Sequence, residues 1–137
     1  MTAVGILPVV GALARLLEPD DEILEVAGKA PEEWAHGRLY VYPTRIAEVP
    51  FETGPGRRQD FALAAVFLGR SGEAALRQTD EELDALLDEL RARYFEAVRH
   101  HPRTELWAHL QAAEARPPRT VDARGVALDI TGWRLVQ

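Results

Sequence analysis

Hydrophobic and polar positions recur along this chain with two different periods, and these periods predict where helices and strands lie. Apolar residues return every three or four positions over 8–18 and, most clearly, over 79–99, which is the spacing of one face of an α-helix. The second segment opens with Thr79 followed three residues later by Glu82, a capping box, and acidic residues fill its first turn. The pattern therefore predicts two helices.

Shorter apolar runs lie between these two segments. Residues 39–42 are rich in β-branched and aromatic side chains, and Ile46 and Val49 follow at looser spacing. Residues 61–68 form an unbroken apolar run that is typical of a central strand buried on both faces. The Gly- and Pro-rich segment 51–60 separates the two runs, so we expect an antiparallel pair joined by a long loop.

The last segment of the chain alternates with period two. Val126, Leu128 and Ile130 fall on one side, and the residues between them fall on the other. Gly132 indicates a bulge, and the apolar residues after it extend the strand to the chain end. We expect this strand to pair inside a sheet or with a neighbouring subunit.

Three weaker elements complete the prediction. A helical turn is expected within 20–26, a short helix over 104–115 and a short strand near Val121. Helices and strands that segregate in this order are typical of an α+β fold. We therefore predict a single domain over 1–137, with a mostly antiparallel sheet packed against two or three helices.

Composition narrows the classes of function. The chain has no Cys, which excludes disulfides, thiolate nucleophiles and Cys-ligated zinc, and it suits synthesis in a cytoplasm. Its net charge of −6 opposes binding to nucleic acid, which needs a basic surface. The most apolar stretch, 3–14, is about half the ~20 residues that cross a bilayer, and it lacks a positive leader. We expect no contact with a membrane.

Candidate chemical groups are few. Ser71 is the only serine, and its surroundings do not match a nucleophile elbow. Glu105 and His109 are four residues apart and would share a face of the predicted short helix, with His101 as a third metal ligand. There is no H-E-x-x-H signature, and exposed polar residues at helix ends are the favoured interpretation. We therefore expect no catalytic, cofactor or metal site, and we predict that the protein is not an enzyme.

The loop 51–60 is the remaining candidate. It has glycines and two arginines but no phosphate-binding motif, and it leads into a strand instead of a helix N-terminus. One interpretation is a plain hairpin loop. The functional interpretation is an arm that docks on another subunit, because Arg forks onto carboxylates and the chain has an acidic surplus. The candidate partner contacts are Phe51, Glu52, Arg57, Arg58 and Asp60.

The order of elements resembles a known family. The features are a short apolar N-terminal helix, the β-rich segment 38–43, the apolar strand 61–69, the long acidic helix 79–99 and a closing strand. This order is similar to that of the tail terminator, or tail completion, proteins of long-tailed bacteriophages (siphovirus tails) and related gene-transfer particles. The resemblance covers most of the chain and rests on pattern and length, without signature residues.

The resemblance implies a virion structural protein that works by assembly. Such proteins form a ring, usually a hexamer, that caps the tail tube at its neck end and stops tube polymerisation. The implied partners are further copies of the chain, the tail tube protein and the head-completion or connector protein. DNA would pass through the lumen without sequence-specific binding. This chain lacks the very long central loop of tube subunits, which favours a terminator.

Two alternatives stay open at this point. The first is another virion protein, either a neck or head–tail connector or a tube subunit. The second belongs to a different class, a small cytoplasmic ligand-binding domain or enzyme. That alternative requires two of the four histidines to lie with a carboxylate in one pocket.

Overall fold

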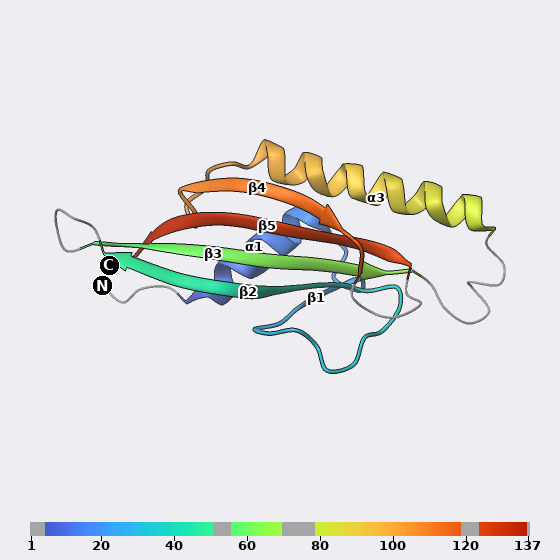
Figure 1. Ribbon diagram of the computed structural model, residues 1–137, viewed down its shortest axis with the longest axis horizontal. Helices are drawn as coiled ribbons and strands as arrows, with labels where there is room; N and C mark the ends of the chain where they lie inside the picture. Colours follow the sequence, from blue (N-terminus) through green and yellow to red (C-terminus); the bar gives the residue numbers. More distant parts are fainter. Residues whose placement is uncertain (1–4, 51–55, 70–78, 119–123, 137) are drawn as a thin grey trace.

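The computed structural model describes residues 5–50, 56–69, 79–118 and 124–136, and two helices and five strands lie within them. Figure 1 shows a long twisted sheet with helices on one of its faces. In chain order the elements are α1 (Ile6–Leu17), β1 (Leu24–Val26), β2 (Leu39–Pro50), β3 (Arg57–Leu68), α3 (Asp80–His100), β4 (His109–Arg116) and β5 (Gly125–Val136).

The strand order across the sheet is β1-β2-β3-β5-β4, so β3 is central and β1 and β4 lie at the edges (Figure 1). β1 runs parallel to β2, and every other neighbouring pair is antiparallel. β4 has a register shift between Leu110 and Ala112, opposite Gly132 of β5. A Cβ added to Gly132 would lie 2.6 Å from the carbonyl oxygen of His109, so only glycine allows this close approach.

The two helices bury one face of the sheet. α1 contributes Val9, Val10 and Leu13 to the core, each fully buried. α3 begins at the predicted capping box, where the Glu82 N–H donates to Thr79 Oγ1 at 3.2 Å. The helix-facing side chains of the strands complete this core; they are Leu39, Val41, Phe61, Leu63, Ala65, Phe67, Val126, Leu128 and Ile130.

The opposite face of the sheet has no helix on it among the described residues. At one end Trp34, from the connection between β1 and β2, packs edge-on against Tyr40 and Tyr42 at centroid distances of 5.2 and 6.1 Å. Beneath these rings lies a small second core that includes Ala64 and Val66. The other end of this face, toward the β2–β3 hairpin, lies beyond this aromatic cover.

The structure confirms the predicted class, a single α+β domain with a mostly antiparallel sheet packed against helices. The helix predicted over 79–99 is α3, the one over 8–18 is α1, and the apolar run 61–68 lies in the central strand. The alternation of the last segment is confirmed, since Leu128 and Ile130 are fully buried against the helices.

Two predicted elements are wrong. The short helix over 104–115 is a loop followed by β4, because pairing with β5 outweighs the helical propensity of its alanines. The Trp107 indole N–H donates to the His101 carbonyl at 3.0 Å and shapes that loop. The helical turn within 20–26 is a turn followed by β1, which gains its partners from β2. The strand predicted near Val121 lies outside the described residues.

Within the described part of the chain, no helix has the length and apolar character needed to cross a membrane.

Candidate assembly surface

The predicted partner-contact residues fall at the hairpin end of the sheet, where β2 finishes and β3 begins. Phe51 and Glu52 lie outside the described residues. Arg57, Arg58 and Asp60 do not belong to a loop, as was expected, but to β3, because the strand pairing continues out to Pro50↔Arg57. The hairpin connection is therefore shorter than the predicted loop 51–60, and its arginines are held in a sheet.

Arg58 and Asp60 lie on the helix-free face, because they are one residue out of phase with the buried Phe61 and Leu63. The Arg58 Nε donates to Asp60 Oδ1 at 2.7 Å. The Arg58 guanidinium also lies over the Trp133 ring of β5, 4.8 Å from its centroid. Cation–π contact and ion pair together hold this arginine flat on the sheet.

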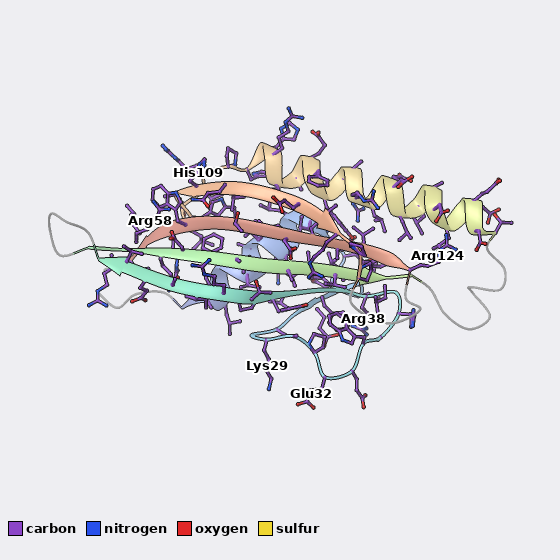
Figure 2. All side chains as sticks on the ribbon, in the orientation of Figure 1. Lys29, Glu32, Arg38, Arg58, His109 and Arg124 are labelled. Carbon is purple, nitrogen blue, oxygen red and sulfur yellow. The ribbon has the colours of Figure 1, made fainter. Side chains whose placement is uncertain are left out.

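Two exposed apolar side chains flank this arginine. Val49 of β2 and Leu135 of β5 are the register partners of Arg58 on either side. Val49 is 47% exposed and Leu135 is 58% exposed, among the highest values for large apolar residues in the described chain. His109 of β4 lies beside Trp133, with ring centroids 6.5 Å apart, and Figure 2 shows it near Arg58 at this end of the sheet. We call Val49, Arg58, Asp60, Trp133 and Leu135 the hairpin patch.

At the same end of the sheet, the side chains that face the helices are polar and form a row of contacts instead of a hydrophobic core. Arg134 of β5 is 5% exposed, and its Nε donates to Gln59 Oε1 at 2.6 Å. The Gln59 amide in turn donates to Glu48 of β2 at 3.4 Å, and Arg57 lies 3.5 Å from the same carboxylate. Burial lowers the pKa of Arg134, and the charge of Glu48 opposes this shift. This row fixes the three strands to one another at their ends.

No protein-family model matches this chain, and no curated protein is significantly similar to it in sequence. The assignment of a function therefore rests on the geometry of the chain itself.

The histidines do not form a metal site in the described structure. His109 lies on β4, so the helical pairing of Glu105 with His109 is wrong. No group of three His, Asp or Glu side chains in the described residues could hold a metal ion. A hollow of about 270 Å³ near the end of α1 contains His101 and Glu105, but no second histidine lines it.

The sequence indicated Arg57 and Arg58 as candidate contacts, but it did not indicate the residues that surround Arg58. Trp133 and Leu135 were assigned only to a terminal strand, and Val49 only to a loosely spaced β segment. Their phase was available in the sequence: Trp133 and Leu135 are odd-numbered, whereas the buried Leu128 and Ile130 are even-numbered. Which strand lies beside Arg58 was not available, because it depends on the order β2-β3-β5.

Proposed function

We propose that this protein is a phage tail terminator subunit, which caps the tail tube as a ring, ends tube polymerisation and provides the surface that joins the head. The order of elements supports the proposal. So does the layered arrangement: among the described residues, helices cover one face of the sheet and leave the hairpin end of the other face open to a partner.

The observation that carries the proposal is the hairpin patch. Single exposed apolar residues are ordinary on a protein surface. Here two of them, Val49 and Leu135, lie on either side of Arg58 on the neighbouring strands. Arg58 is already oriented by Asp60 and Trp133, so it loses little side-chain freedom on binding. An apolar surface with a pre-oriented arginine is typical of a protein–protein contact.

The charge of the chain also suits a ring around DNA. A net charge of −6 gives a surface that repels a passing duplex and does not retain it by counterion release. The lumen of such a ring needs this property, because DNA must pass through it.

The deciding experiment is complementation of a particle that lacks this chain. We expect overlong tails, or tails that do not join heads, and we expect the natural chain supplied in trans to restore both. Electron microscopy of purified tails measures their length and the fraction joined to heads. Tails of normal length that join heads without the protein would contradict the proposal. Tails of normal length that fail to join heads would favour the neck or connector alternative.

The hairpin patch is tested in the same assay. Leu135→Asp places a carboxylate on the exposed face of β5 and should abolish rescue without unfolding the chain. Ala85→Asp, on an exposed position of α3, is the matched control and should rescue fully. Equal rescue by the two variants would show that the patch contacts no partner.

A further inference from the structure

The long helix α3 lies along the sheet without packing closely on β4, as Figure 1 shows. Hollows of about 510 and 630 Å³ lie between the helix and that strand, one beside Phe95 and the other beside Leu87. Only three side chains of α3 are buried, and they are Leu87, Tyr94 and Val98. Because tertiary packing supplies most of the stability of a helix, α3 depends on its remaining contacts to stay in place.

The second half of α3 is held by contacts from which water is largely excluded. Tyr94 is 1% exposed and packs within the main core. The neighbouring Arg93 forms an ion pair with Glu18, which follows α1 directly and has a side chain that is only 6% exposed. Separating such a pair is costly, because it leaves a buried charge without compensation. This half of the helix is therefore fixed to α1.

The first half of α3 is held by ion pairs that lie in water. Arg124, which immediately precedes β5, donates from Nη1 to Asp80 Oδ1 at 2.7 Å and from Nη2 to the Asp84 carboxylate. Figure 2 labels this arginine where β5 begins, beside the start of α3. The side chains of Asp80 and Asp84 are 91% and 64% exposed, so water competes for both contacts. We call these three residues the Arg124 clamp.

The backbone of Arg124 is fixed to the sheet. Its carbonyl accepts the Gly69 N–H at 2.6 Å, directly after the end of β3. Gly125, the next residue, lies so close to the Phe67 backbone that an added Cβ would not fit. The Arg124 clamp therefore attaches the start of the helix to a fixed point at the end of the central strands.

The carboxylates in the first half of α3 repel one another. Asp80, Asp84 and Asp88 are spaced by four residues, which places them on one face of the helix. Like charges at this spacing destabilise a helix. Arg124 contacts the first two, whereas Arg91 reaches Asp88 only at 3.8 Å. Without Arg124 the repulsion would act against this half of the helix.

We infer that residues 80–90 of α3 open and close as a unit, and that the Arg124 clamp holds them closed while the second half stays on the core. Opening uncovers Leu87 together with the partly buried Leu83 and Leu90, and it widens the hollow beside β4. Salt shifts the balance, because the ion pairs lie in water. The inference concerns the chain alone and does not depend on the proposed function.

Cysteine labelling tests the opening directly, because the natural chain has no thiol. Leu87→Cys and Val98→Cys place single thiols at positions that are 6% and 7% exposed, one in each half of the helix. We expect a maleimide to label Leu87→Cys about tenfold faster than Val98→Cys in the native state. Urea unfolding of each variant gives the rate that global unfolding alone would produce. Labelling of Leu87→Cys at or below that rate would overturn the inference.

Arg124→Gln tests the clamp itself. It should speed the labelling of Leu87→Cys about fivefold and leave Val98→Cys unchanged, because it removes exposed ion pairs from one half of the helix only. Arg99→Gln is the matched control; it removes an exposed pair with Glu96 in the second half and should change neither rate. Equal acceleration at both thiols would contradict the inference, since it would mean a loss of global stability. No acceleration at Leu87→Cys would contradict it as well.

Salt distinguishes a clamp from an ordinary structural contact. With Arg124 present, sodium chloride up to about 0.5 M should speed the labelling of Leu87→Cys, because it screens the arginine from its carboxylates. In Arg124→Gln the same salt should slow the labelling, because it screens only the repulsion among the aspartates. A response of the same sign in both proteins would show that Arg124 does not hold the segment closed.

Hydrogen exchange repeats the comparison without any cysteine, so the inference stays testable even when Leu87→Cys does not fold. In the natural chain, amides of residues 83–90 should exchange faster than those of residues 93–100. Exchange at one common rate along α3 would mean that the helix opens only as a whole and would overturn the inference.

Discussion

The two faces of the sheet are covered in different ways, and β5 shows both in a single strand. On the helix side its residues Leu128 and Ile130 are fully buried beneath α1 and α3. On the other side Trp133 is half-buried and Leu135 is mostly exposed. Among the described residues, the helices cover most of one face, whereas the other is covered beneath Trp34 and is open at the hairpin end. The open part is where a partner would contribute to the structure.

The sharpest test of this comparison uses two leucines of the same strand. Leu128→Ala should lower the free energy of unfolding by about 3 kcal/mol, because it removes a fully buried side chain and leaves a cavity. Leu135→Ala should lower it by less than about 0.5 kcal/mol, because that side chain is mostly in water already. Urea unfolding measures both. Similar losses for the two variants would mean that the hairpin end is covered in solution by the protein itself.

The long helix and the central strands were predictable because their signals are local. α3 begins one residue after Thr79 because the threonine side chain accepts the Glu82 N–H, and that spacing is visible in the sequence. The alternation of apolar residues in β5 likewise indicates which of its side chains face the helices. Neither prediction needed any knowledge of a distant segment.

The edge strands were not predictable because their signals are not local. β4 contains alanines and an Arg–Glu pair that suit a helix. Its conformation is imposed by pairing with residues 127–133 of β5, which lie later in the chain. β1 has three residues and depends on β2 for its hydrogen bonds. For the same reason the candidate site was only half predictable: Arg58 was named, but its contacts Trp133 and Leu135 depend on strand order.

The second test compares two tryptophans on the helix-free face. Trp34→Ala should lower the free energy of unfolding by about 2 kcal/mol, since it removes two edge-to-face contacts and uncovers the small second core. Trp133→Ala should cost about 1 kcal/mol or less, because it removes mainly an exposed cation–π contact with Arg58. The larger loss should be at Trp34 in thermal and urea unfolding. A larger loss at Trp133 would contradict the view that the hairpin end is the open part of this face.

The smallest expected effect concerns a tyrosine in the sealed helix layer. Tyr94 of α3 is 1% exposed, and its hydroxyl has no hydrogen-bond partner among the described residues. Removing an unpartnered hydroxyl costs nothing in lost bonds, so Tyr94→Phe should change the free energy of unfolding by less than about 1 kcal/mol at neutral pH. Tyr40→Phe is the control. Its hydroxyl accepts the Ala35 N–H at 2.9 Å, so this variant should lower the free energy of unfolding by about 1 kcal/mol.

Alkaline pH should enlarge the difference between Tyr94→Phe and the natural chain. Burial raises the pKa of Tyr94 above its ordinary value, although the nearby Arg93 opposes the shift. Above about pH 10 the unfolded chain releases the phenol proton while the folded chain retains it, so the natural protein loses stability as pH rises and the phenylalanine variant is spared this loss. Urea unfolding of both proteins from pH 7 to about pH 10.5 measures the divergence. Parallel curves would mean that water reaches this hydroxyl, and that the helix-covered face is less completely closed than its burial indicates.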